Sequence, residues 1–127
     1  MSFKAKLLNI LALTCALLSA QVSAHVHLSK TFPVAESESV MPPEKLKLGF
    51  SAEVKVIKLK LTESSGNTVD FGFKPALQSA KSMEWSLPML SSGNYQVDWT
   101  VLGNDGHKMS GNYAFVVKHG HEHHASH

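Results

Sequence analysis

The chain has 127 residues, of which 43% are apolar and 17% are charged, and its formal net charge is +2 at pH 7. All 12 basic residues are lysine, so the chain lacks the arginine side chains that make bidentate contacts with phosphates and base edges. With a single cysteine, Cys15, it forms no internal disulfide. We therefore expect a protein that does not bind nucleic acid and whose fold depends on an apolar core.

The first 24 residues have the order of a secretory signal peptide. Lys4 and Lys6 provide a positive start, residues 7–20 form an apolar run, and small residues follow up to Ala24. The apolar run is shorter than a comfortable transmembrane span. We therefore expect residues 1–24 to be cleaved and the remaining chain to be exported without being embedded in the membrane.

The cleavage position decides which residue becomes the new amino terminus. Cleavage after Ala24, the favoured interpretation, leaves His25 first, whereas cleavage after Ala20 leaves Gln21 first. Cys15 is removed in either case. The exported chain then has no thiolate ligand, which excludes a blue-copper electron-transfer site.

Alternating apolar residues predict an all-β domain over residues 25–118. Leu46, Leu48 and Phe50 share one face of a strand, and a one-residue slip of the alternation at Ile57 predicts a β-bulge. Period two with one buried face is typical of antiparallel strands packed in two layers. We expect seven strands, near residues 26–32, 45–51, 54–62, 67–71, 84–87, 94–102 and 110–117.

The spacing of strands and turns favours a Greek-key β-sandwich or barrel of the immunoglobulin or cupredoxin type. Gly93 lies two residues before Tyr95, which is typical of a tyrosine corner, and Tyr95 and Trp99 share the apolar parity that predicts burial. Residues 71–82 are the least regular and are expected to form a loop. Residues 119–127, with five histidines and no large apolar side chain, are expected to form a disordered His-rich tail.

The three histidines between the signal and the tail lie in two places. His25 and His27 are at the expected amino terminus, and His107 follows Asp105 by two residues. An amino-terminal histidine can chelate a metal through its ring and its α-amine, whose pKa is about 8. Asp105 and His107 are expected to face the same way in an extended strand. Together these residues offer three nitrogen donors and one oxygen donor, a set that suits Cu(II) better than zinc.

Two alternatives remain open for these residues. A chain that begins His25-Val26-His27 can bind Cu(II) by itself, through the amine, two backbone amides and the imidazole of His27. In a folded chain His27 is instead a fourth nitrogen ligand or a partner of a ligand. Asp105-Gly106 between two strands is also typical of a plain hairpin turn that has no role in metal binding.

The segment from Tyr95 to Phe115 resembles the CopC family of periplasmic copper-binding proteins, with its tryptophan-containing strand, its Asp-Gly-His loop and its Ser-Gly-x-x-x-Phe strand. The start of the exported chain resembles that family as well, and the likeness extends over residues 25–118. The resemblance implies a seven-stranded Greek-key fold. It also implies a Cu(II) site made by His25, Asp105 and His107.

Some members of the CopC family also hold Cu(I) in a methionine-rich loop. The methionines of the exported chain are Met41, Met83, Met89 and Met109, and no two of them lie within four residues of each other. Because Cu(I) prefers several soft thioether donors close together, this spread predicts a site for Cu(II) alone.

The favoured function is that of an exported, monomeric, periplasmic Cu(II)-binding protein that is not an enzyme. It would sequester copper, confer copper resistance, or deliver copper to an inner-membrane copper transporter of the CopD type, as the resemblance implies. One alternative is a copper-dependent oxidative enzyme with its site at the amino-terminal histidine. Another is an immunoglobulin-like binding module that holds no metal.

Overall fold

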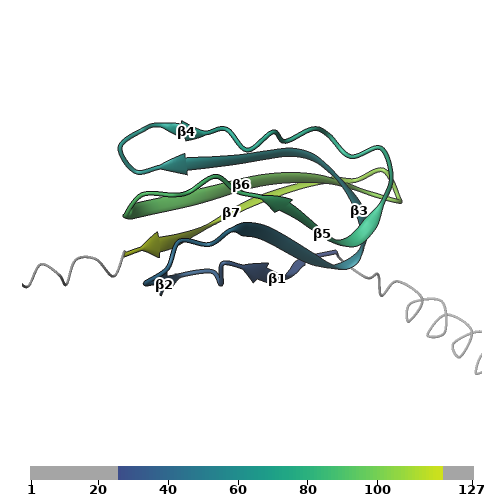
Figure 1. Cartoon of the computed structure of the whole chain (residues 1–127). Helices are drawn as coiled ribbons and strands as arrows, with labels where there is room; N and C mark the ends of the chain where they lie inside the picture. Colours follow the sequence, from purple (N-terminus) through teal and green to yellow (C-terminus); the bar gives the residue numbers. More distant parts are fainter. Residues whose placement is uncertain (1–25, 119–127) are drawn as a thin grey trace, which may run out of the picture.

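The computed structural model describes residues 26–118, which form seven β-strands and no helix (Figure 1). In chain order the strands are β1 (Leu28–Phe32), β2 (Ser37–Ser39), β3 (Lys45–Glu63), β4 (Thr68–Val69), β5 (Ala80–Ser86), β6 (Gly93–Gly103) and β7 (Lys108–Val117). Nothing within residues 26–118 is a helix long and apolar enough to cross a bilayer. The predicted signal peptide, His25 and the predicted His-rich tail lie outside the described residues.

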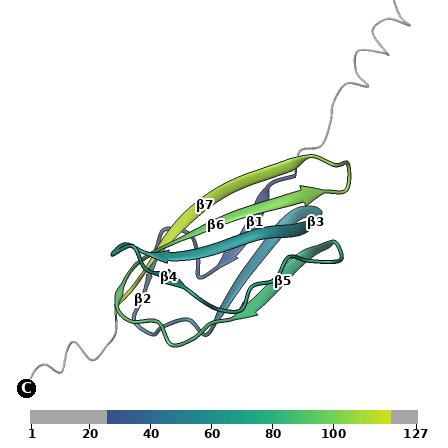
Figure 2. The ribbon, with the colours of Figure 1, turned by 90° about the horizontal axis from the view of Figure 1, so that it is seen from above.

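Strand β3 is the centre of the fold because it belongs to both layers. Its first part, Lys45–Gly49, pairs with β1 on one side and β5 on the other. Its second part, Val54–Glu63, pairs with β6, and the larger layer continues through β7 to β2. Figure 2 shows β3 between β5 and β6, so that the sheet curls around a shared core. The predicted all-β sandwich is confirmed.

The core lies between the two layers and is built by the alternation that the sequence predicts. Leu46, Leu48 and Val54 of β3 are at most 1% exposed. The pairing of β3 with β6 shifts register between Val56 and Lys58, which confirms the predicted bulge. The extra residue returns the following apolar side chains to the core face of the sheet.

The tyrosine corner is present at the start of β6. The hydroxyl of Tyr95 donates a hydrogen bond to the backbone oxygen of Ser91 at 2.7 Å, and the ring stacks on Phe115 with a centroid distance of 5.4 Å. Trp99, expected to be buried, is only half-buried. Its ring packs edge-on against Phe50. The ring also lies over Gly111 of the neighbouring strand, where any side chain would collide with it.

Three predicted elements differ from the observed strands. The predicted strands 45–51 and 54–62 are one continuous strand, β3, which bends while it changes partners. Residues 37–39 form β2, a short parallel partner of β7 that the alternation did not predict, because it contains only serine and glutamate. Strand β5 begins at Ala80, inside the predicted loop 71–82, where it starts to pair with β3.

Candidate metal centre

The turn between β6 and β7 presents the predicted loop ligands at one end of the sandwich. The backbone N–H of Gly103 donates to the oxygen of His107 at 2.8 Å, and the N–H of Gly106 donates to the oxygen of Gly103 at 3.0 Å. Gly106 has a φ of 88°, in the left-handed region that glycine adopts without strain. The tight turn therefore fixes the backbone from which Asp105 and His107 project.

Both oxygens of the Asp105 carboxylate bond to His107. Oδ1 accepts the backbone N–H of His107 at 3.0 Å, and Oδ2 lies 2.8 Å from the ring Nδ1. Because an ionised carboxylate has no proton to give, Nδ1 is the donor in the second bond. This arrangement leaves the other ring nitrogen, Nε2, available to a metal. A carboxylate behind an imidazole is a common way to orient a histidine ligand.

The two side chains change each other's protonation. The hydrogen bond from the His107 ring, followed by the one from its backbone N–H, lowers the pKa of Asp105. The same side-chain bond, followed by the charge of the carboxylate, raises the pKa of His107. The side chains are 66% and 81% exposed, so water screens the pair and it adds little to the stability of the fold. The pair is thus held together yet open to a ligand.

The structure brings two of the four predicted ligands together. Asp105 and His107 meet in the turn, whereas His25 lies outside the described residues. His27 exchanges bonds with Ser51: its N–H donates to the serine Oγ at 3.0 Å, and its oxygen accepts the serine N–H at 2.9 Å. Among residues 26–118, no three His, Cys, Asp or Glu side chains are gathered so that they could hold a metal ion.

The described chain begins at the end of the sandwich that carries this turn. Val26 packs against the core, and His27 lies beside Ser51 of β3. Three residues further along β3, Val54 pairs with Gly103, the last residue of β6. Figures 1 and 2 show the start of the described chain near the β6–β7 turn. The start of the described chain and the turn that carries Asp105 and His107 are therefore at the same end of the sandwich.

Met109 is a neighbour of this turn that the sequence pattern did not predict. A methyl group placed on the Cα of Gly103 would lie 3.0 Å from Oδ1 of Asp105 and 3.6 Å from Cε of Met109. The carboxylate of Asp105 and the end of the Met109 side chain therefore both lie close to Gly103. The sequence gives one sign of this closeness: Asp105, His107 and Met109 follow one another at intervals of two residues.

Comparisons with known proteins show which sequences this chain is similar to. The sequence profile of the CopC domain matches residues 28–118. Protein YobA of Escherichia coli K12 is 34% identical over 110 residues, covering 84% of this chain and 89% of that protein. Copper resistance protein C of Escherichia coli is 36% identical over 106 residues, covering 75% of this chain and 82% of that protein.

Solved structures give the same result. The crystal structure of CopC from Methylosinus trichosporium OB3b superposes with a TM-score of 0.65 and 28% identity, over 76% of this chain and 96% of that one. PcoC, a methionine-rich copper resistance protein from Escherichia coli, superposes with a TM-score of 0.62 and 33% identity, over 75% of this chain and 100% of that one. By its domain match, its relatives and its fold, the chain belongs to the CopC family.

Proposed function

We propose that the protein is exported to the periplasm and binds Cu(II) there as cargo, without catalysing a reaction. Copper is the ligand to expect of a chain in the CopC family, and relatives of this chain are named copper resistance proteins. In this proposal cleavage after Ala24 makes His25 the amino-terminal residue. The protein sequesters Cu(II), or passes it to an inner-membrane copper transporter of the CopD type, and acts as a monomer.

The observation that carries this proposal is the Asp105–His107 pair at the end of the sandwich where the described chain begins. The amine and ring of His25 would supply two nitrogens and His107 a third. Asp105 would supply an oxygen once its carboxylate exchanges the hydrogen bond with Nδ1 of His107 for the metal. Cu(II) prefers nitrogen and oxygen donors in a tetragonal arrangement, and this set provides them. His27 is kept as a weaker candidate, because its backbone is occupied by Ser51.

A competition titration tests the proposal. The exported protein, beginning at His25, is titrated with Cu(II) in the presence of a chelator that reports only the tightest site. His107→Ala should lower the affinity for Cu(II) at least about 100-fold, because loss of a metal ligand should cost more than loss of a residue that only hydrogen-bonds to a ligand. His27→Ala, which also removes an exposed imidazole, separates the two modes of binding, since it should lower the affinity much less than His107→Ala if the turn is the site.

The role of the amino terminus is tested by one added residue. A glycine placed before His25 keeps every side chain but moves the free amine away from the histidine. We expect a loss of affinity comparable to that of His107→Ala. If His107→Ala binds as tightly as the unmodified protein while His27→Ala does not, the local His25-Val26-His27 mode is correct and the turn is not the site.

A further inference from the structure

The outer face of the larger layer is formed by β3, β6 and β7, and its side chains can be followed across the strands in rows. Counted from the β6–β7 turn, the first three rows are Lys55, Leu102 and Lys108, then Lys58, Thr100 and Ser110, then Lys60, Asp98 and Asn112. These residues alternate along the strands with side chains that face the core, such as Val56, Val101 and Met109, so they point away from it. The three rows therefore display four lysines and one aspartate to the outside.

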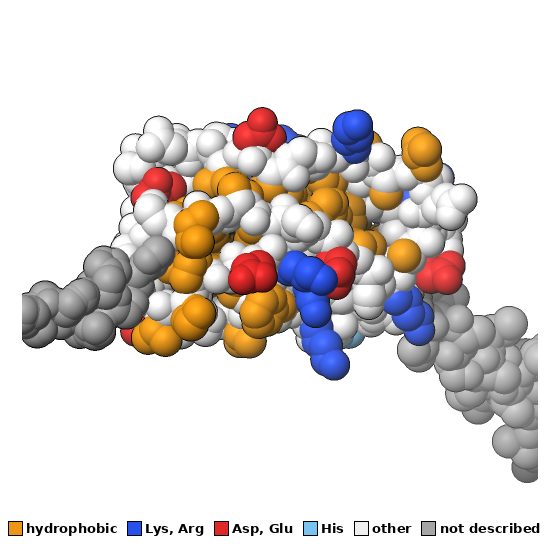
Figure 3. All heavy atoms as spheres, in the orientation of Figure 1, with side chains coloured by type: hydrophobic (Ala, Val, Ile, Leu, Met, Phe, Trp, Pro, Cys, Tyr) orange, Lys and Arg blue, Asp and Glu red, His pale blue; other side chains and the backbone are white. Residues whose placement is uncertain are grey.

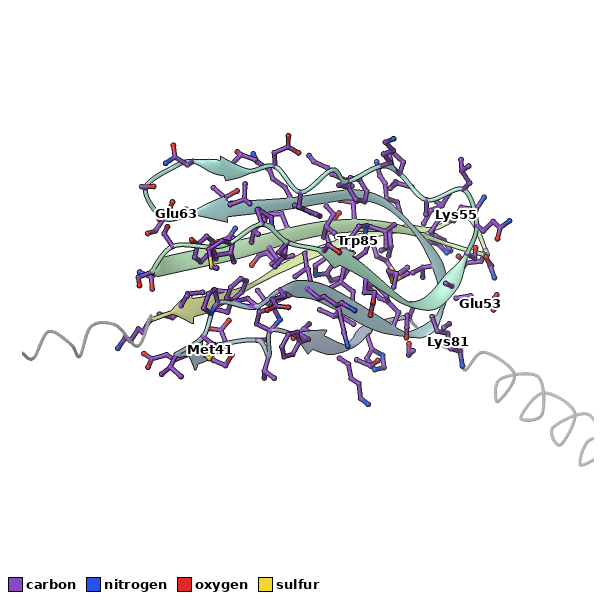
Figure 4. All side chains as sticks on the ribbon, viewed as in Figure 1. Met41, Glu53, Lys55, Glu63, Lys81 and Trp85 are labelled. Carbon is purple, nitrogen blue, oxygen red and sulfur yellow. The ribbon has the colours of Figure 1, made fainter. Side chains whose placement is uncertain are left out.

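The positive charge of this face is greatest beside the β6–β7 turn. The first row carries two lysines and the second carries one, whereas in the third row Lys60 faces Asp98 across the strands. Figure 4 shows Lys55 at one end of the molecule and Glu63, which pairs with Tyr95 in β6, at the opposite end. The two rows nearest the turn thus hold three positive charges and no acidic residue.

These lysines differ from those of the smaller layer in having no acidic partner. Lys45 and Lys47 lie 3.0 and 3.8 Å from carboxylate oxygens of Glu84. Within residues 26–118, no carboxylate oxygen lies within 4.0 Å of Nζ of any lysine on the outer face, although Glu53 is only two residues before Lys55. A group of unpaired charges of one sign attracts a partner of the opposite charge.

The second and third rows border an open hollow with a volume of about 540 Å³. The polar side chains that line this hollow are Lys58, Lys60, Asp98, Thr100, Ser110 and Asn112. Asp98 is already held by the amide of Gln96, 3.1 Å away. The ammonium, hydroxyl and amide groups of the others can donate hydrogen bonds to a carboxylate. The hollow therefore suits an acidic side chain that reaches it from a partner surface.

The same rows offer little to the apolar part of a membrane. They contain no aromatic residue, and their one large apolar side chain, Leu102, is partly buried between Lys55 and Lys108. Surfaces that insert into lipid present large apolar side chains beside their basic ones. A protein partner with Asp and Glu at matching positions needs only complementary charge and hydrogen bonds. The composition of the face thus favours an acidic protein over a membrane.

We propose that the outer face of β3, β6 and β7 docks a protein surface rich in aspartate and glutamate, centred on Lys55, Lys58 and Lys108. The first row directly borders the turn that carries Asp105 and His107, so a protein docked there lies beside the proposed copper site. The inference goes beyond the proposed function, because it assigns the place and the chemistry of a partner. It does not depend on copper, since the lysines and the hollow belong to the metal-free fold.

Nuclear magnetic resonance of the copper-free exported protein tests the docking face, with a decaglutamate peptide as the acidic probe. A pH of about 8 keeps ordinary imidazoles neutral, so that lysines supply the positive charge. We expect the backbone amides of Lys58, Leu102 and Lys108 to shift as peptide is added, and those of Lys45 and Lys47 to stay in place. Shifts confined to the smaller layer, or no shifts at all, would overturn the proposal.

Two double variants measure what the lysines contribute. Lys55→Gln/Lys108→Gln and Lys45→Gln/Lys47→Gln remove the same amount of charge, so they differ in where it is lost. The first should bind the peptide about fivefold more weakly than the unmodified protein, because each exposed ion pair contributes modestly. The second is the matched control and should bind like the unmodified protein. Equal losses would show that the peptide responds to net charge alone, which would contradict a docking face.

Lipid vesicles separate an acidic protein from a membrane as the partner. Sedimentation with vesicles that contain phosphatidylglycerol, compared with vesicles of phosphatidylcholine alone, should show no binding that depends on Lys55 and Lys108. Binding to the anionic vesicles that is lost in Lys55→Gln/Lys108→Gln, without shifts caused by the peptide, would make a membrane the partner and overturn the proposal. None of these measurements uses copper, so the Cu(II) titration judges the proposed function separately.

Discussion

The two ends of strand β6 differ in what their side chains contact. At its start, Tyr95 is 3% exposed, bonds to the backbone of Ser91 and stacks on Phe115. Beyond its end, Asp105 and His107 are mostly exposed and bond to each other. Burial at the first end stabilises the fold, while exposure at the second leaves donor atoms free for a ligand. Changes at the two ends should therefore affect different measurements.

The surface shows a second difference along the molecule. Phe32, Val40 and Met41 are 47%, 68% and 71% exposed, and they line a groove together with Pro42 and Pro43. Figure 3 shows apolar side chains gathered on this part of the face that carries β1 and β2. The described residues that line this groove include no histidine. The proposed site is instead at the end where the hairpin turn projects polar side chains.

The largest effect on stability is expected from Phe115→Ala. Phe115 is 1% exposed and stacks on Tyr95, so truncation leaves a cavity in the core. The free energy of unfolding should fall by about 3–5 kcal/mol, which thermal unfolding will detect as a lower Tm. Asn112→Ala, an exposed change in the same strand, is the control and should stay within about 0.5 kcal/mol. A loss under about 1 kcal/mol would contradict this view of the core.

Tyr95→Phe should have a smaller effect at the same end. It removes the hydroxyl that bonds to Ser91 and leaves a backbone carbonyl without that donor, so we expect a loss of about 1–2 kcal/mol in chemical denaturation. Tyr113→Phe is the matched control. Its hydroxyl is buried and has no hydrogen-bond partner within the described residues, so its removal should cost nothing or stabilise. A similar loss in both variants would show that the corner bond adds no stability.

The alternation of apolar residues predicted the core well, but it could not show which strands are neighbours. Leu46, Leu48, Phe50, Val54 and Val56 keep a single phase, with small Ala52 between them. That unbroken phase is the mark of one long strand, whereas two strands, 45–51 and 54–62, were predicted. Strand β2 left no apolar alternation, because it contains only serine and glutamate and pairs with β7 through its backbone.

The pairing of the loop residues was predicted, but for a different reason from the one observed. Residues two apart in a strand face the same way, and on this ground Asp105 and His107 were expected to point in one direction. They lie instead in the turn, and the aspartate reaches both the N–H and the ring of the histidine around Gly106. The carboxylate of Asp105 also lies close to Gly103, where a Cβ would be 3.0 Å from Oδ1, and spacing alone does not reveal this.

The smallest expected effect concerns the titration of the copper-free turn. Nuclear magnetic resonance should give His107 a pKa above its ordinary value of about 6.5, since Asp105 hydrogen-bonds to the ring and carries a negative charge. Asp105→Asn removes that charge and should return the pKa of His107 towards the ordinary value. Ser110→Ala, an exposed change in the same hairpin, should leave it unaltered. An unchanged pKa in Asp105→Asn would mean that the pair does not form in solution.

The directions of the two pKa shifts define the pH range in which the Asp105–His107 pair stabilises the fold. The raised pKa of His107 contributes stability that is complete below its unfolded value and is lost as pH rises through the folded one. The lowered pKa of Asp105 contributes stability that is present above its unfolded value and is lost as pH falls through the folded one. Copper must displace the proton held by His107. Its binding should therefore weaken as pH falls through the raised pKa, in a titration of Cu(II) affinity against pH.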